Sequence, residues 1–274
     1  LPACRSASYG DHMVRTRPGA EVVWEVDPPA DGDPAALLAQ IEVVGEVASS
    51  VLVPDNHTGR ATVSSLAVAR RVKDAGLRPM ACLNARDRNL LGLRRDLLTC
   101  AFEGVDDVLL VYGDRPAAGT RASDLTVRRM VEECRSRTPD LRVGVTTRLG
   151  PVPRWKLAAD RLLVQVSYDL DALCAWRDTV AFDGPVIPAV LVVGSVAMAE
   201  RLAERVPELR VPEPWLDAIA ADPRAGTELA MDLAERILAS GAFDGVHVVS
   251  GRRYRAAAAR LRRTTARLAP PVAV

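Results

Sequence analysis

A chain of 274 residues, 49% of them hydrophobic, is long enough for one large domain or two small ones, and an α/β barrel typically uses about 250 residues. Its 36 basic and 35 acidic residues leave a net charge of +1, which points to no nucleic-acid or membrane-surface partner. The longest apolar run is too short to span a membrane, and the first twelve residues lack the apolar core of a signal peptide. We therefore expect a cytoplasmic protein whose residues 1–19 form a disordered leader or a cloning remnant.

The five cysteines, at positions 4, 82, 100, 134 and 174, are scattered along the chain and include no C-x-x-C pair. An odd number without metal-ligand spacing argues against both a disulfide framework and a metal site. Buried, reduced thiols are the expected state.

Short apolar runs alternate with helix-length segments along the chain. Pro34 suits a first helical turn, Gly76 suits a helix end, and residues 62–75 carry an apolar stripe at helical spacing. The expected strands are 21–26, 50–53, 79–83, 107–111, 141–145, 161–166, 185–189 and 245–249. The expected helices are 34–47, 62–75, 89–103, 122–137, 169–180 and 196–205, with further helices within 207–241.

Eight strands alternating with helices, apolar where both faces must be buried, favour a parallel sheet that closes into a barrel. An open doubly wound sheet is the alternative, but it usually carries a G-x-G-x-x-G loop after its first strand, where this chain has VDPPADGDP. No repeat or linker divides the sequence. We predict the α/β class, with residues 20–274 forming a single (β/α)8 TIM-type barrel that has extra helices before the last strand.

The working residues of such a barrel follow the carboxyl ends of its strands. Glu25 lies among apolar residues, where an unpaired carboxylate is costly, so a catalytic role and an ion-pair role are both open. Gln165 interrupts an apolar strand, which favours a ligand contact. Asp114 follows a glycine and is by itself more typical of a turn. His57 and His247 are more typical of structural residues, and no Ser-His-Asp or paired-carboxylate arrangement is found in the sequence.

Five motifs at these strand ends together resemble the methylenetetrahydrofolate reductase family. The family's early Glu-x-x-Pro-Pro is matched by EVDPP at 25–29, and its T-D-N-like segment by PDNHTGR from Pro54. Its H-L-T-C-R-D-R-N, D-L-L helix and T-G-D-P-P are matched by CLNARDRN, LLGLRRDLL and LLVYGDRP. LLVQVSYD matches I-T-Q-x-x-x-D, and AMDLAERILASGAFDGVHVVSGRR resembles the last barrel helix and strand. The matches follow the family's order.

The resemblance implies a TIM-barrel oxidoreductase of one-carbon metabolism that acts on CH–NH donors and reduces 5,10-methylenetetrahydrofolate to 5-methyltetrahydrofolate. It makes Glu25 the acid that opens the substrate ring to an iminium, to which a hydride then adds. Asp114 would contact the pterin and stabilise developing positive charge. Gln165 would hydrogen-bond the folate, and Asp55 and Asn56 are also expected at the substrate.

The resemblance also implies a reduced cofactor, NAD(P)H or a flavin (FAD). The residues expected to contact it are Cys82, Asn84, Arg86, Asp87, Tyr112, Gly113, Arg154 and Lys156. Cys82 and Asn84 replace the family's histidine and threonine, and the Y-P-E-x-H-P segment after the fifth strand is missing. This shortening argues against tight FAD binding and leaves direct transfer from NAD(P)H, or a dissociable deazaflavin, open.

Two other functions stay open at this point. The chain could be a non-catalytic folate-binding paralogue or partner subunit, or a barrel enzyme acting on another one-carbon or pterin substrate in specialised metabolism. A tetrahydrofolate is the expected partner, and a homo-oligomer is compatible with the sequence.

Overall fold

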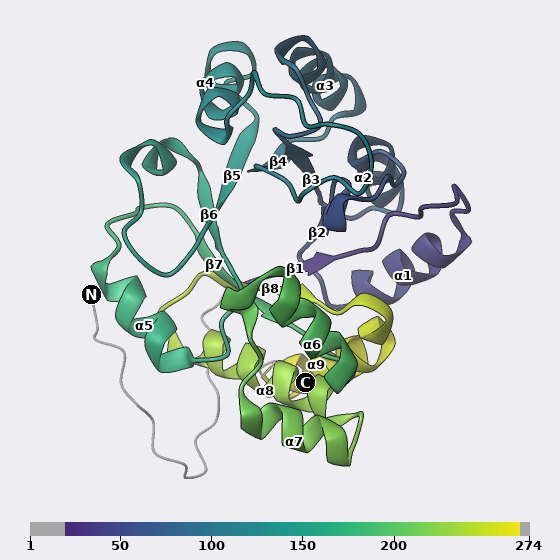
Figure 1. Ribbon diagram of the computed structural model, residues 1–274, viewed down its shortest axis with the longest axis vertical. Helices are drawn as coiled ribbons and strands as arrows, with labels where there is room; N and C mark the ends of the chain where they lie inside the picture. The colour runs from purple at the N-terminus through teal and green to yellow at the C-terminus, as the bar shows by residue number, and fades with distance from the viewer. Residues whose placement is uncertain (1–19, 269–274) are drawn as a thin grey trace, which may run out of the picture.

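The computed structural model describes residues 20–268, so the leader expected at 1–19 lies outside the described residues. Eight parallel strands pair in sequence order, and the last also pairs with the first, which closes a barrel. Figure 1 shows this barrel with helices packed around it. The strands are β1 (Glu21–Glu25), β2 (Ser50–Val53), β3 (Pro79–Asn84), β4 (Asp107–Val111), β5 (Arg142–Thr147), β6 (Arg161–Val164), β7 (Val186–Leu191) and β8 (Gly245–Val249). The predicted (β/α)8 fold class is confirmed.

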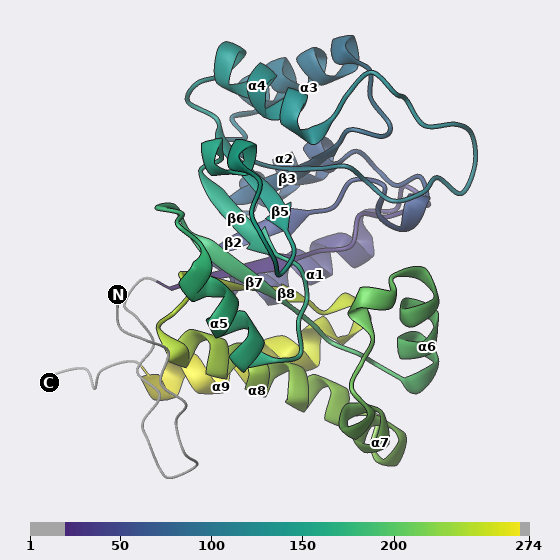
Figure 2. The ribbon, with the colours of Figure 1, turned by 60° about the vertical axis from the view of Figure 1, so that its left-hand side comes forward.

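The helices cover the outside of the barrel, with α3 and α4 at one end of the view in Figure 2 and α8 and α9 near the other. The α-helices are α1 (Ala35–Gly45), α2 (Ser65–Asp74), α3 (Leu90–Glu103), α4 (Val127–Arg137), α5 (Leu170–Thr179), α6 (Val196–Arg205), α7 (Glu213–Ala221), α8 (Ala225–Ser240) and α9 (Tyr254–Leu268). The 3-10 helices are η1 (His57–Gly59), η2 (Arg154–Ala158), η3 (Pro207–Leu209) and η4 (Gly251–Arg253). As predicted, extra helices precede the last strand.

Besides shifts of a few residues at element ends, the structure differs from the expected elements at α4, at η2 and at α9. The helix expected from residue 122 begins at Val127, because Thr126 is the N-cap and its side chain accepts a hydrogen bond from the Arg129 N–H. The crossover between β5 and β6 carries only η2, in keeping with the shortened sequence there. The alanine-rich helix α9 was not among the expected elements.

Strand alternation decides which residues lie inside the barrel. Val23 belongs to an apolar layer inside the barrel with Leu52, Met80, Cys82, Leu109, Leu163 and Ile187. Glu21 lies two residues before Val23 and Glu25 two residues after it, so both face the same way as Val23. The barrel interior therefore has an apolar middle with a carboxylate toward each end.

The amino-terminal end of the interior is closed by an ion cluster. Arg161 Nη1 lies 3.2 Å from Glu21 Oε2, and Arg161 Nη2 lies 3.0 Å from Asp107 Oδ2. Ser50 Oγ donates to Glu21 Oε1 at 2.7 Å. Gly144 leaves room for the arginine, since an added Cβ would meet Arg161 Cγ at 3.0 Å. Each buried charge in this cluster faces an opposite charge, which is the arrangement of a structural plug.

Cys82, Cys100 and Cys134 are free and buried, as expected. Burial raises the pKa of Cys100 and of Cys134 to about 12, which keeps these two thiols protonated and unreactive. The expectation of reduced cysteines is wrong for Cys174, which is disulfide-bonded. No helix within residues 20–268 is long and apolar enough to cross a membrane.

Candidate active site at the carboxyl end of the barrel

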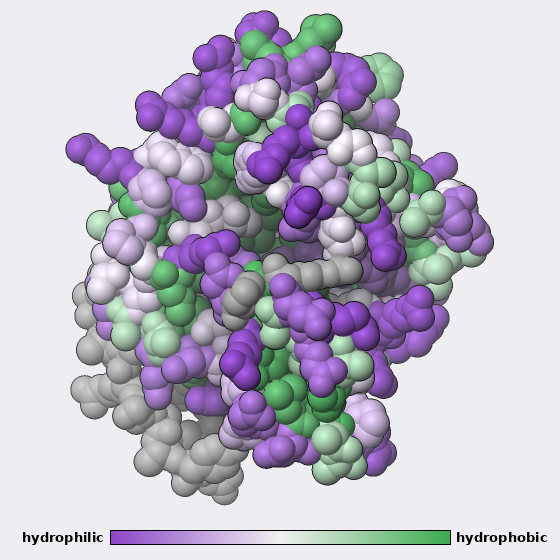
Figure 3. Space-filling view, in the orientation of Figure 1, coloured by the Kyte–Doolittle hydropathy of each residue, from purple (hydrophilic) through white to green (hydrophobic). Residues whose placement is uncertain are grey.

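A cavity of about 720 Å³ opens at the carboxyl ends of the strands, within the range of roughly 300–1,000 Å³ that is usual for small-molecule sites. Leu52, Leu109 and Leu163 of the inner apolar layer line it, and the loops after β2, β4 and β5 contribute further residues. The surface in Figure 3 is mostly hydrophilic, with paler and hydrophobic residues visible in the hollow near its middle. The cavity therefore combines an apolar base with polar walls.

Glu25 and His247 lie side by side in this cavity. They come from the neighbouring strands β1 and β8, and Glu25 Oε2 lies 3.3 Å from His247 Nε2. The Glu25 side chain is 20% exposed and that of His247 is 9% exposed. The buried Nε2 has no hydrogen bond of good geometry among the described residues. A carboxyl beside an imidazole at the edge of a cavity is suited to proton transfer.

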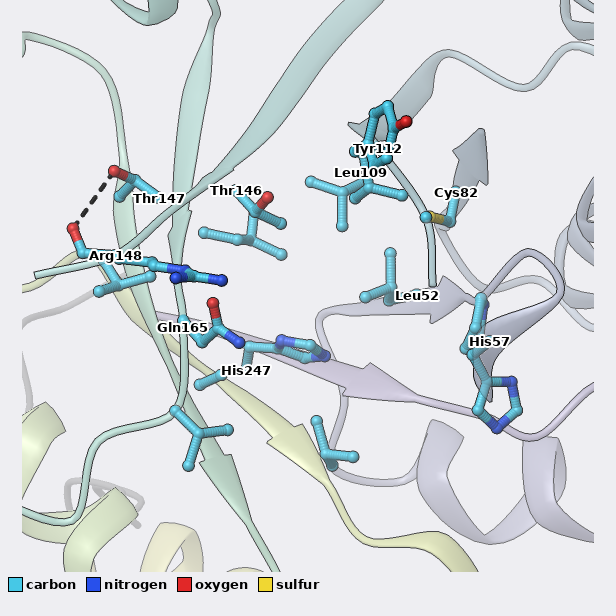
Figure 4. A pocket seen from close by; sticks show the side chains of 18 of the residues that line it. Leu52, His57, Cys82, Leu109, Tyr112, Thr146, Thr147, Arg148, Gln165 and His247 are labelled. Carbon is cyan, nitrogen blue, oxygen red and sulfur yellow. Dashed lines mark hydrogen bonds between the residues drawn. The ribbon is translucent and has the colours of Figure 1, made fainter. Parts of the chain in front are cut away.

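Gln165 and two cations, Arg148 and Lys156, also line the cavity. Gln165 follows β6, and its backbone N–H donates to the Thr147 carbonyl, while no hydrogen bond of its side-chain amide is found among the described residues. Figure 4 shows Gln165, Arg148 and His247 extending into the same part of the cavity. Lys156 Nζ donates to the Thr146 carbonyl at 2.8 Å. The amide group of Gln165 is thus available to a ligand.

Asp114 ties the loop after β4 to the loop after β2. Its Oδ2 accepts a hydrogen bond from the Thr58 N–H at 2.6 Å. Asn56 and Thr58 have φ values of 49° and 60°, and a positive φ is costly for a β-branched residue such as Thr58. Gly59 lets the loops approach, because an added Cβ would lie 1.9 Å from the Arg115 carbonyl oxygen. This strained contact holds the Asp114 carboxylate at the edge of the cavity.

Arg86, Asp87 and Arg88, which follow β3, form a network with their neighbours behind the cavity. Asn84 is fully buried, and its Nδ2 donates to Asp55 Oδ2 at 2.7 Å and to Asp87 Oδ2 at 3.0 Å. Arg88 pairs with Asp55 and, at 2.8 Å, with Asp96. Arg86 pairs with Asp87, and its hydrogen bonds hold the pKa of Asp87 down at about 2. These side chains bind one another, so they fix the loops after β2 and β3.

The structure brings part of the predicted site together. The predicted residues that line the cavity are Glu25, Asp55, Cys82, Tyr112, Gly113, Asp114, Lys156 and Gln165. The predicted residues outside its lining are Asn56, Asn84, Arg86, Asp87 and Arg154. Asn56 donates to Asp87 at 2.9 Å and so belongs to the network behind the cavity. Their roles in binding stay predictions.

A resident flavin dinucleotide needs a cradle of backbone N–H groups or cations for its diphosphate. Of the residues predicted to contact it, Lys156 is the cation in the cavity lining, and it already donates to a backbone carbonyl. The Tyr112 hydroxyl accepts from Arg121 at 2.8 Å, and Arg154 lies outside the lining. The residues predicted to contact the cofactor therefore form no diphosphate cradle, which does not fit tightly bound FAD, and no chemical step is derived through a flavin.

Two residues of this site were not predicted from the sequence. His247 follows from the strand-end rule and lies in the last matched motif, but a structural role was expected for it, and that role does not account for its place beside Glu25. Arg148 follows β5 in a segment without a motif, so the barrel rule for strand ends was the one signal available.

A comparison with models of known protein families matches part of this barrel to one family. The model described as "Methylenetetrahydrofolate reductase" matches residues 155–264. Residues 155–264 belong to the methylenetetrahydrofolate reductase family. This range holds Lys156, Gln165 and His247, whereas Glu25 and Asp114 lie before it. The family predicted from the motifs is confirmed. No protein with a curated description matches the sequence significantly.

Two solved structures share the fold of this barrel. One is an uncharacterised protein from Clostridium thermocellum that binds two copies of 5-methyl-5,6,7,8-tetrahydrofolic acid, with 14% identity, a TM-score of 0.65, and coverage of 91% of this chain and 96% of that one. The other is EDTA monooxygenase from Chelativorans sp. BNC1, with 10% identity, a TM-score of 0.53, and coverage of 93% of this chain and 95% of that one. At these identities the likeness concerns the fold.

Proposed function

We propose that the chain is an oxidoreductase that reduces 5,10-methylenetetrahydrofolate to 5-methyltetrahydrofolate. The observation that carries this proposal is the meeting of Glu25, beside His247, with Gln165 in one cavity whose base is apolar. Glu25 supplies an acid, Gln165 supplies an amide that can pair with the edge of a pterin, and the apolar base suits a flat ring. The family match over residues 155–264 supports the same substrate class.

The proposed reaction begins with a proton that moves from the Glu25 carboxyl to N10 of the folate. The bond between N10 and the methylene carbon then breaks, which leaves an iminium at N5. A hydride from the reduced donor adds to that carbon, so the substrate gains two electrons and the donor loses them. His247, 3.3 Å from Glu25, is placed to return a proton to the carboxylate.

Asp114 would stabilise the positive charge of the iminium. Its carboxylate is held at the cavity edge by the Thr58 N–H, so it need not reorganise as charge develops. Gln165 would orient the pterin relative to Glu25. The donor we favour is a dissociable nicotinamide, because the residues predicted to hold a resident flavin form no diphosphate cradle. A cytoplasmic location and a homo-oligomer stay predictions.

A second candidate is folate binding without turnover. The structure of similar fold from Clostridium thermocellum binds 5-methyltetrahydrofolate, which is consistent with a binding role as well as with catalysis. The two candidates differ in one respect only: a binder holds the folate and leaves the nicotinamide unoxidised.

The experiment that tests the proposal mixes purified protein with methylenetetrahydrofolate and NADH or NADPH. We expect loss of nicotinamide absorbance and formation of 5-methyltetrahydrofolate, together with a protein spectrum that lacks flavin bands. Folate binding without product, with nicotinamides, flavins and deazaflavins all tried as donors, would favour the second candidate. Absence of any folate binding would exclude both.

A further inference from the structure

Asp27 follows Glu25 by two residues, just beyond the end of β1. The Val26 N–H donates to the Leu52 carbonyl at 3.1 Å, so the pairing with β2 continues past Glu25. Side chains two residues apart on an extended chain point to the same side, with their Cα atoms about 6.6 Å apart. Glu25 lines the cavity, whereas Asp27 lies outside the cavity lining and is exposed. A second carboxyl thus follows Glu25 toward the solvent.

Groups from three other elements surround Asp27. On α1, the buried Gln40 accepts a hydrogen bond from the Asp27 N–H at 3.0 Å. His57 in η1 and Arg252 in η4 are close enough for their charges to act on the carboxyl. The pKa of Asp27 is raised from 3.8, first because protein atoms desolvate the carboxyl and then because Glu25 is negatively charged. The three neighbours act in the opposite direction. A carboxyl with a raised pKa takes up and passes on a proton more readily near neutral pH.

Both histidines within residues 20–268 stand near this pair of carboxyls. His247 lies 3.3 Å from Glu25, and the charge of His57 acts on Asp27. Figure 4 shows His57 set apart from Gln165 and His247, on the far side of Leu52. The Nδ1 atom of His57 is buried and has no hydrogen-bond partner among the described residues. Because β8, β1 and β2 are neighbours in the barrel, the order along its rim is imidazole, carboxyl, carboxyl, imidazole.

The proposed reaction takes one proton from Glu25 in each turnover. The His247 side chain is only 9% exposed, so a proton that it returns to Glu25 has to be replaced from the solvent in turn. A pterin on the apolar base of the cavity would cover Glu25 from the cavity side. Asp27 lies outside the lining, so its contact with water does not depend on whether the cavity is filled.

We propose that Asp27 is a proton relay that reloads Glu25 from the solvent while the cavity is occupied. A hydronium ion gives a proton to the Asp27 carboxylate, and the resulting carboxyl passes a proton to the Glu25 carboxylate, directly or through one water. Over one turnover the solvent loses one proton and N10 of the folate gains one. His57 and Arg252 would limit the repulsion between the two carboxylates. This inference rests on the proposed function, and it makes Asp27 a positioning residue that acts through Glu25.

The test measures turnover of methylenetetrahydrofolate as a function of pH and of buffer concentration. Asp27→Asn keeps the shape of the side chain but removes the exchangeable proton, so kcat should fall about tenfold, and the loss should grow as the pH rises. Imidazole buffer at high concentration should restore most of the lost rate, because a small acid can protonate Glu25 in place of the relay. The wild type should respond little to the same buffer. The affinity for 5-methyltetrahydrofolate, from calorimetric titration, should stay within about twofold, since Asp27 lies outside the cavity lining.

Three further variants separate the relay from a structural role. Asp31→Asn makes the same exchange on the same loop, at an exposed carboxylate that accepts from the Asp33 N–H at 3.0 Å and lies outside the cavity lining. It should change neither kcat nor the response to buffer. Asp27→Glu returns a carboxyl and should recover part of the rate without added imidazole. Glu25→Gln should stay inactive at every buffer concentration, because the acid itself is missing.

The outcomes keep this inference distinct from the proposed function. A loss of rate in Asp27→Asn that imidazole does not restore would overturn the relay, and a lower Tm in the same variant would make Asp27 structural. An unchanged kcat in Asp27→Asn over the whole pH range would overturn the relay as well. In each case 5-methyltetrahydrofolate formed by the wild type leaves the proposed function standing. A wild type that forms no 5-methyltetrahydrofolate with any donor would overturn both.

Discussion

Each end of the barrel interior carries a glutamate from β1, but the side chains around the two glutamates differ. At the amino-terminal end, Glu21 and Asp107 share Arg161, whose side chain is only 6% exposed. At the carboxyl end, Glu25 faces His247 at 3.3 Å, and the Gln165 amide has no side-chain hydrogen bond among the described residues. Glu21 and Glu25 come from one strand and face the same interior.

The comparison teaches how one strand serves both stability and chemistry. A carboxylate that shares a buried arginine in an ion cluster contributes to structure. A carboxylate beside a histidine, with a cavity in front of it, keeps the capacity to exchange a proton. We therefore expect substitutions at the two ends to separate into losses of activity and losses of stability.

The largest expected effect is on the rate. Glu25→Gln keeps the shape of the side chain but removes the acid, so kcat/KM for methylenetetrahydrofolate should fall by about a thousandfold, as for other general acids. Glu21→Gln makes the same exchange at the other end of β1 and should keep kcat within a few fold while lowering Tm. Steady-state assays of both variants, with thermal melts, measure this. Equal loss of activity in the two variants would remove the distinction between the ends.

The next effect is on stability. Arg161→Met leaves the buried Glu21 and Asp107 carboxylates without their cation and should lower the free energy of unfolding by about 3 kcal/mol. Arg148→Met breaks only an exposed pair with Glu208 and should change the free energy of unfolding by less than about 1 kcal/mol. Urea unfolding measures both, and similar values for the two variants would contradict the comparison.

A smaller effect is expected on substrate affinity. Gln165→Leu should weaken 5-methyltetrahydrofolate binding by about tenfold, because the pterin edge would lose its amide partner. The chain's other glutamine gives the matched control. Gln40 is buried and accepts from the Asp27 N–H at 3.0 Å, so Gln40→Leu should reduce stability and spare the affinity. The account of Gln165 would fail if the two variants showed the same affinity loss.

The smallest effect concerns acid stability. The pKa of Asp87 is about 2, below the ordinary value of 3.8, because Arg86 binds its ionised form. Folding thus favours the carboxylate, which contributes about 1–2 kcal/mol of stability above pH 4, lost as the pH falls toward 2. Asp87→Asn should lower stability at neutral pH, and its difference from the wild type should shrink through this window. If the difference in stability between Asp87→Asn and the wild type stays constant with pH, the effect comes from packing and not from the charge of Asp87.

Much of the barrel could be predicted from the sequence because buried parallel strands and their caps have local signatures. The apolar runs at 50–53 and 107–111 and the proline at 34 mark strands and a helix start without tertiary information. Helix α9 was missed although its alanine-rich sequence favours a helix, and the start of α4 depended on which residue became the cap.

The site could be predicted only where it carries a motif. Glu25, Asp114 and Gln165 lie in motifs and do line the cavity. Asn84 and Arg86 also lie in a motif. Their side chains nevertheless do not line the cavity, because they pair with Asp55 and Asp87. His247 lies in a motif as well, but only the closed barrel brings it to Glu25, and Arg148 lies in no motif.

The most direct test of the central claim follows the hydride. Protein is incubated with methylenetetrahydrofolate and nicotinamide carrying deuterium at the transferable position, and the product is examined by mass spectrometry. We expect one deuterium in the methyl group of 5-methyltetrahydrofolate with wild type and with Glu21→Gln, and a nearly complete loss of product with Glu25→Gln. Unlabelled product, or full labelling with Glu25→Gln, would contradict the role assigned to the carboxyl end of the barrel.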